Sequence, residues 1–175
     1  GFDACSELAF ESIESMNAGF SSEKYLESVR QDEDAFIDKS RFSLALVREQ
    51  LATGDLSAAP SSAIKTITAL RHHPATGGGQ LASIICNEVA SFVAEDEPLA
   101  QRVLITDHQA HDGLPPGVFD AVFMAWFPNL DRARAHLRSA NRARAELALA
   151  GFVFGRVDLL ATEIHVVAPP GEAVH

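Results

Sequence analysis

The 175-residue chain has few cysteines and no long apolar run. Its two cysteines, Cys5 and Cys86, lie far apart and outside any Cys-x-x-Cys pattern, which argues against a zinc site or a disulfide framework. Because no stretch of about 18 apolar residues is present, we expect no membrane partner. The first residues have neither the basic start nor the apolar segment of a secretory signal, so we predict a cytoplasmic location.

Positive charge is also scarce, because 14 Lys and Arg residues face 24 Asp and Glu residues, for a net charge of −10. Such a surface repels a phosphate backbone, so nucleic acid is not an expected partner. Apolar residues make up 47% of the chain, which is enough for a core. The length fits one domain, or a small domain with a helical appendage.

The N-terminal segment has the pattern of a helical hairpin. Ala9, Ile13, Met16 and Phe20 recur at steps of four, three and four, which predicts one helix. After a break at Ser21-Ser22, a second helix is expected from about Glu23 to Ala52, ending where Gly54 takes a left-handed C-cap conformation. We expect residues 1–58 to dimerise as a four-helix bundle that covers the apolar stripe of the hairpin. The alternative is that this stripe packs on the rest of the same chain.

Residues 59–175 alternate helical and strand patterns. The expected elements are a short helix or strand at 63–70, a helix at 80–94, strands at 102–107 and 119–127, a helix at 131–150, and a closing hairpin at 151–157 and 163–168. The short links between paired strands favour a mixed or antiparallel sheet. The predicted fold class is therefore α+β: the helical hairpin followed by a two-layer α/β sandwich with helices on one face of the sheet.

Polar residues are densest at Asp107-His108-Gln109-Ala110-His111-Asp112, whose imidazoles and carboxylates suit a divalent metal. On a strand, however, His108 and His111 differ by an odd number and point to opposite faces. Polar residues of a hairpin are the favoured interpretation, and no metal site is predicted. A small-molecule or metal-dependent hydrolase using Asp107–Asp112 remains the alternative function.

Three other features have weaker signals. His72-His73 stand in a loop, where solvated side chains are favoured over ligands. Gly77-Gly78-Gly79 precede a helix, but neither phosphate-loop pattern is present, so a flexible loop is favoured over a ligand-binding one. The arginines at 134, 138 and 142 fall at i, i+4 and i+8, which predicts a basic ridge that is more simply solvated than a docking site. No catalytic residue is predicted from these patterns.

One segment, Arg41-Phe-Ser-Leu-Ala-Leu-Val-Arg-Glu-Gln-Leu51 followed by Ala-Thr-Gly-Asp-Leu-Ser57, resembles the second dimerisation helix and following loop of bacterial sensor histidine kinases. Arg48 stands where that group usually has His. The segment Gln80–Val89 is similar to the family's N-box helix, and this resemblance implies that Asn87 and Glu88 bind the ATP cofactor. Residues 145–169 resemble the closing helix and hairpin of the same ATPase fold.

The chain also departs from that family. No His occurs in residues 1–60, Phe92 stands at the position of the Mg²⁺-holding Asn, and no Asp-x-Gly-x-Gly box follows Phe127. The resemblance therefore implies a scaffold like that of a histidine kinase or phosphotransferase, with a degenerate, ATP-inactive domain at 59–175 and no functional cofactor. We expect it to act in two-component signalling as a homodimer that contacts the receiver domain of a response regulator.

Overall fold

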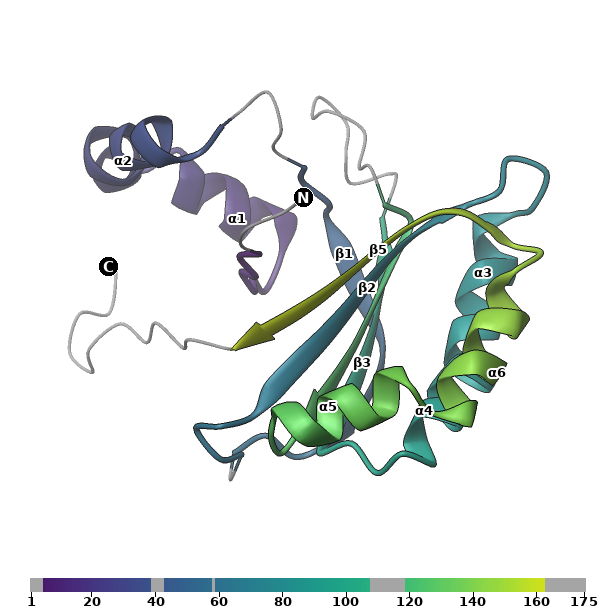
Figure 1. Cartoon of the computed structure of the whole chain (residues 1–175). Helices are drawn as coiled ribbons and strands as arrows, with labels where there is room; N and C mark the ends of the chain where they lie inside the picture. The colour runs from purple at the N-terminus through teal and green to yellow at the C-terminus, as the bar shows by residue number, and fades with distance from the viewer. Residues whose placement is uncertain (1–4, 39–42, 58, 108–118, 163–175) are drawn as a thin grey trace. The chain divides into compact units, whose positions relative to one another are not determined.

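The computed structural model describes residues 5–38, 43–57, 59–107 and 119–162 (Figure 1). These residues form two compact units. The first unit comprises the described residues up to Leu46 together with Asp107, and the second comprises Val47–Thr106 and the described residues from Phe119 onward.

The first unit is helical. It contains α1 (Ile13–Phe20), the π-helix η1 (Tyr25–Val29) and α2 (Arg30–Phe36). A capping box begins α1, because the Ser12 hydroxyl accepts from the Ser15 amide at 3.1 Å and the Ser15 hydroxyl accepts from the Ser12 amide at 3.1 Å. The spacing of Ile13, Met16 and Phe20 is thus confirmed as helical.

The predicted second helix, from Glu23 to Ala52, is wrong. Helical structure ends at Phe36, and the segment Val47–Gly54 is a strand, β1, which pairs antiparallel with β3 (Ala100–Thr106). The residues of β1 include several good helix formers, but the backbone hydrogen bonds to β3 override that propensity. The predictions of a long helical hairpin and of a four-helix bundle formed by it are therefore wrong. The division of the chain at residues 58 and 59 into separate domains stays a prediction.

The second unit is built on a five-stranded sheet in the order β1-β3-β4-β2-β5, in which all neighbours are antiparallel. One helical segment links β2 to β3, and two helices link β4 to β5. The remaining bounds are β2 (Ile64–His72), α3 (Gly78–Ile84), the π-helix η2 (Ile85–Val89), α4 (Ala90–Ala94), β4 (Ala121–Phe127), α5 (Leu130–Leu137), α6 (Ala140–Leu149) and β5 (Val153–Thr162).

This order is the β-α-β-β-α-β arrangement of the ferredoxin-like fold, with β1 added at one edge. The predicted fold class is corrected accordingly, because the chain's first strand comes from the segment assigned to a dimerisation helix. Several individual predictions are confirmed, namely the strands near 102–107 and 119–127 and the helix at 80–94. The helix predicted at 131–150 is two helices, because Ser139 caps a new one by accepting from the Arg142 amide at 2.9 Å.

Helices cover one face of the sheet (Figure 1). Alternate strand residues face them, as the period of two requires, and pack on Leu81, Ile85 and Leu149. The intervening strand residues, among them Met124 and Trp126, form a second apolar cluster on the opposite face. β4 is therefore buried on both faces, whereas exposed and partly buried residues alternate along β5, at the edge of the described sheet.

Candidate functional site

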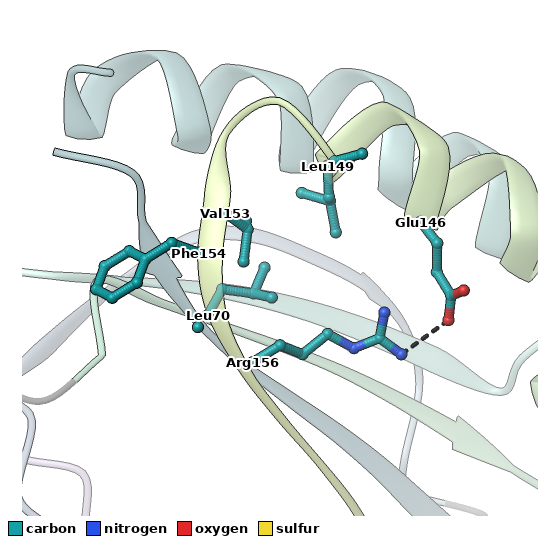
Figure 2. A pocket seen from close by; sticks show the side chains of 8 residues that line it. Leu70, Glu146, Leu149, Val153, Phe154 and Arg156 are labelled. Atoms are coloured by element: carbon teal, nitrogen blue, oxygen red, sulfur yellow. Dashed lines mark hydrogen bonds and ion pairs between the residues drawn. The ribbon is translucent and has the colours of Figure 1, made fainter. Parts of the chain in front are cut away.

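A pocket lies between α6 and β5, with β2 beneath it. It is open to solvent and has a cavity volume of about 200 Å³, which is smaller than a typical small-molecule site. In Figure 2, Phe154 lies at one end, Glu146 and Arg156 lie at the other, and apolar side chains line the space between them: Leu70, Leu149 and Val153. The pocket is thus an apolar slot with a charged end.

The apolar end is shaped by an irregularity in β5. His72 pairs with Val153 and Arg71 pairs with Gly155, so Phe154 is the extra residue of a β-bulge. Bulges re-aim side chains at sheet edges. The Phe154 ring is 53% exposed, and the Arg71 guanidinium lies 5.1 Å from its centroid. Phe154 therefore forms the solvent-facing wall of the slot.

The charged end is centred on Arg156. Its Nε donates to Asp158 Oδ2 at 2.5 Å and its Nη2 donates to Glu146 Oε1 at 2.8 Å. Within the described part of the chain, Arg156 Nη1 and Glu146 Oε2 have no hydrogen-bond partner. Both side chains are partly exposed. The pocket thus has one unpaired donor group and one unpaired acceptor at the same end.

A second arginine, Arg142, lies behind this pair and is buried. Its Nε donates to Glu146 Oε1 at 3.0 Å, its Nη2 to Asp158 Oδ1 at 2.7 Å, and its Nη1 to the Thr68 hydroxyl at 3.3 Å. The Thr68 hydroxyl donates in turn to Asp158 Oδ1 at 2.7 Å. We call these four residues, together with Arg156, the Arg142 network. It contains two guanidinium and two carboxylate groups, so its net charge is zero.

The surroundings of Glu146, Asp158 and Arg156 shift the pKa of each group in the direction that favours its charged form. The hydrogen bond from Arg156 is the main cause that lowers the pKa of Glu146. Burial acts to raise the pKa of Asp158, but the Thr68 hydroxyl and the charge of Arg142 bring it below its usual value. Burial acts against the charge of Arg156, but its bonds to both carboxylates raise its pKa. The pocket therefore presents fixed charges rather than a proton-transfer pair.

A separate polar cluster surrounds Asp96, between the end of α4 and the start of α6. Asp96 Oδ2 lies 2.6 Å from His136 Nδ1 and accepts from the Ser139 hydroxyl at 2.7 Å, while Oδ1 accepts from the Asn141 amide at 2.8 Å. The His136 ring is buried and stacks on Phe127 with centroids 4.8 Å apart. We call these four polar residues the Asp96 clip.

The protonation of the Asp96 clip follows from its burial. Burial lowers the pKa of His136 more than the neighbouring carboxylate raises it, so the imidazole is neutral at pH 7. Burial acts to raise the pKa of Asp96, but hydrogen bonds from Ser139, His136 and Asn141 lower it on balance. Because Ser139 donates to the carboxylate and not to the imidazole, the clip does not activate a nucleophile and instead joins two helix ends.

The residues predicted to bind a cofactor lie elsewhere. Asn87 and Glu88 are exposed residues of η2, and the Asn87 amide donates to the Ser83 hydroxyl at 3.1 Å. Neither residue lines the pocket. Their role in cofactor binding stays a prediction, but the histidine-kinase resemblance that motivated it is removed by the fold.

Most of the Asp107–Asp112 cluster falls in residues 108–118, outside the described residues. The amide of Asp107 donates to the Leu46 carbonyl at 2.9 Å. Among the residues that the structure describes, no three or more His, Cys, Asp or Glu side chains are grouped to hold a metal. The hydrolase alternative therefore gains no support.

The second unit also shows where His72, the three glycines before α3 and the arginines of the predicted basic ridge lie. His72 Nδ1 lies 2.8 Å from Asp120 Oδ2 at the end of β2. A Cβ added at Gly77, Gly78 or Gly79 would meet no protein atom within 4 Å, so no neighbouring part of the described chain requires glycine there by close approach. The predicted basic ridge is wrong, because α5 ends at Leu137 and Arg142 is buried while Arg134 and Arg138 are exposed.

Of the five residues of the Arg142 network, only Arg142 belongs to a pattern singled out from the sequence. One signal for them was present. Arg142 and Glu146 are four residues apart on a helix, and Arg156 and Asp158 are two apart in an otherwise apolar strand, where charges are unusual. Both pairs predict a charged contact on one face of their element, although not the contact between them.

Comparison with known proteins finds solved structures that share this fold. The sequence profile of the EthD domain matches residues 1–40, too small a part of the chain to assign it to that family. No curated protein matches the sequence. The structure of an anthrone oxidase-like protein is similar over 87% of this chain and 67% of its own, with 14% identity and a TM-score of 0.62.

Two further structures have the same fold at low identity. One, from Lactobacillus acidophilus NCFM, is provisionally named a monooxygenase and is similar over 87% of this chain and 69% of its own, with 11% identity and a TM-score of 0.53. The other, a major regulator of staphylococcal pathogenesis, covers 85% of this chain and 94% of its own, with 11% identity and a TM-score of 0.52. Since the names differ, the likeness establishes the fold alone.

These findings correct the predicted family and function. The ferredoxin-like topology and the similarity to an anthrone oxidase-like protein replace the histidine-kinase or phosphotransferase resemblance. The role in two-component signalling and the contact with a response regulator depended on that resemblance and are withdrawn with it. Within the described residues, no helix combines the length and apolar character needed to cross a membrane.

Proposed function

We propose that the second unit is an oxygenase that oxidises a small, flat aromatic ketone in the pocket between α6 and β5. The observation that carries this proposal is the apolar slot ending at the unpaired Nη1 of Arg156. An aromatic ring system fits beside Leu149, Val153 and Phe154, and its carbonyl oxygen accepts from Arg156. The fold shared with an anthrone oxidase-like protein supports an anthrone as the first substrate to test.

The chemistry of this substrate class is compatible with the charged end. When the ring carbon opposite the carbonyl loses a proton to solvent water, the electron pair left behind places negative charge on the carbonyl oxygen. A guanidinium N–H directed at that oxygen stabilises the developing charge. Arg156 is suited to this because Asp158 and Glu146 hold its guanidinium in one orientation before the substrate binds.

The overall reaction balances with oxygen as the only co-substrate. Anthrone, C₁₄H₁₀O, and O₂ give anthraquinone, C₁₄H₈O₂, and one water. The substrate supplies all four electrons, so one oxygen atom enters the product, the other leaves as water, and no external reductant is required.

The test is turnover by the full-length chain. Purified protein is mixed with anthrone in air-saturated buffer, and oxygen consumption and anthraquinone formation are followed together against a protein-free blank. We expect equimolar oxygen use and quinone formation above the blank. The variant Arg156→Gln should lower the rate about tenfold or more, whereas Arg144→Gln, at an exposed arginine on α6 outside the pocket, should not. No rate above the blank would refute the proposal.

The homodimer predicted from the sequence stays a proposal, now on a different basis. The edge strand β5 of the described sheet and the adjoining face of α6 carry exposed apolar side chains, Phe154 at 53%, Leu160 at 45% and Leu147 at 78%. Such residues at a sheet edge favour association with a second copy. Light scattering after gel filtration tests this, and a monomer at micromolar concentration would contradict it. The cytoplasmic location stays a prediction.

A further inference from the structure

The charged end of the pocket offers two different unpaired groups to a ligand. Arg156 Nη1 is a donor, and Glu146 Oε2 is an acceptor on the same carboxylate that holds Arg156 through Oε1. Both residues line the pocket, and Figure 2 shows them together at one end. A ligand group that reaches this end therefore meets a donor on Arg156 and an acceptor on Glu146, two residues that are hydrogen-bonded to each other.

The charge at this end is balanced. The Arg142 network contains two guanidinium and two carboxylate groups, and the buried Arg142 donates hydrogen bonds to both carboxylates. An anionic ligand would gain one hydrogen bond from Arg156 but would bring its charge next to Glu146. Like charges placed together at a binding site weaken binding. The network therefore disfavours a ligand that binds with a full negative charge, although an arginine faces the ligand. A ketone binds as a neutral molecule, and Arg156 stabilises only the charge that develops on its oxygen during the reaction.

We infer that the pocket selects a ligand whose polar group is neutral and carries an acceptor and a donor on neighbouring atoms, such as a primary amide or an enol beside a carbonyl. Its acceptor binds Arg156 Nη1 and its donor binds Glu146 Oε2. This rests on the proposed function and narrows its substrate class: an aromatic ketone with a hydroxyl group beside the carbonyl offers both groups, whereas anthrone itself offers only the acceptor. Arg142 is a positioning residue, since it holds both carboxylates and is buried away from the ligand.

Three naphthalenes of nearly the same shape test this inference. 2-Naphthamide has both an acceptor and a donor, methyl 2-naphthyl ketone has only an acceptor, and 2-naphthoate is an anion. Binding to the full-length chain is measured by titration of methyl resonances, with Leu149 and Val153 as reporters of the pocket. We expect the amide to bind about tenfold more tightly than the carboxylate, with the ketone between them.

The variant Glu146→Gln removes the negative charge and keeps an oxygen that accepts from Arg156. It should strengthen binding of 2-naphthoate about tenfold and thereby abolish the preference for the amide. The matched control is Glu95→Gln, which removes a carboxylate paired with Arg144 outside the pocket and should leave the order unchanged. Circular dichroism and the melting temperature check that both variants fold.

The outcomes separate this inference from the proposed function. If 2-naphthoate shifts the Leu149 and Val153 methyls and binds as tightly as the amide in the wild type, this inference is overturned while the pocket remains. If none of the three compounds shifts these methyls, the pocket fails as a ligand site, and both proposals fail with it. If the amide preference and its loss in Glu146→Gln are seen without oxidation of anthrone, only the oxygenase proposal fails.

Discussion

The two polar clusters around α6 differ in what they leave unpaired. In the Asp96 clip, both oxygens of the carboxylate are bonded within the protein, and the unpaired His136 Nε2 is buried. In the Arg142 network, the unpaired atoms are Arg156 Nη1 and Glu146 Oε2, which belong to partly exposed residues of a pocket. Similar residue types therefore serve different purposes, and the exposure of the unpaired atom separates a structural cluster from a candidate site.

Removing the central arginine should have the largest effect on stability. Arg142→Met leaves Asp158 and Thr68 without their buried partner, and breaking such a pair costs about 3 kcal/mol. Asp158 and Glu146 would still be paired with Arg156 and are partly exposed, which reduces this cost. We therefore expect the free energy of unfolding to fall by about 2 to 3 kcal/mol, as measured by urea denaturation. Arg144→Met, at an exposed ion pair two residues away, should cost less than about 1 kcal/mol. Equal losses of stability in Arg142→Met and Arg144→Met would contradict the prediction that the buried ion pair contributes more than the exposed one.

Removing the carboxylate of the clip should have a smaller effect. Asp96→Ala deletes the acceptor of three hydrogen bonds from His136, Ser139 and Asn141, and a buried donor left unpaired costs about 1 kcal/mol or more. We expect a loss of about 2 kcal/mol with no change in ligand binding at the pocket. The neighbouring variant Glu95→Ala removes an exposed carboxylate and serves as the control. A change in pocket binding in Asp96→Ala would show that the two clusters are coupled.

The smallest expected effect is a pH dependence of the free energy of unfolding that arises from His136 in the Asp96 clip. The folded-state pKa of His136 is lowered, so the unfolded chain binds a proton first as the pH falls below about 6.5. Stability is therefore complete above that pH and declines as the pH falls, until His136 is protonated in the folded state. The variant His136→Phe should reduce the slope of unfolding free energy against pH between about 5 and 7. An unchanged slope would contradict a neutral, buried His136.

The sequence predicts the central strands well because their signals are local. The apolar runs at 102–107 and 119–127 and the periodic helix at 80–94 need no distant contact to be recognised. The strand β1 was missed because Arg48 to Leu51 favour a helix by composition, and only pairing with β3 makes them a strand. The break at Ser139 was missed because a cap inside a helical pattern is a weak signal.

The candidate site was less predictable than the fold. Arg142 contacts Thr68, which lies 74 residues earlier in the chain, and Asp158, which lies 16 residues later. No spacing rule relates these positions, because the crossing of α6 over β2 and β5 brings them together. The spacing of each charged pair within its own helix or strand is a weak signal that was not used, and only the tertiary fold joins the two pairs into a network.

Gly54 is the last residue of the edge strand β1, and its backbone conformation restricts which residues can stand there. Its φ is +83°, and a Cβ at this position would overlap the carbonyl oxygen of Leu99. A homologue with any other residue here must end β1 earlier or shift its pairing with β3. The length of β1 and its register against β3 therefore depend on glycine at this one position.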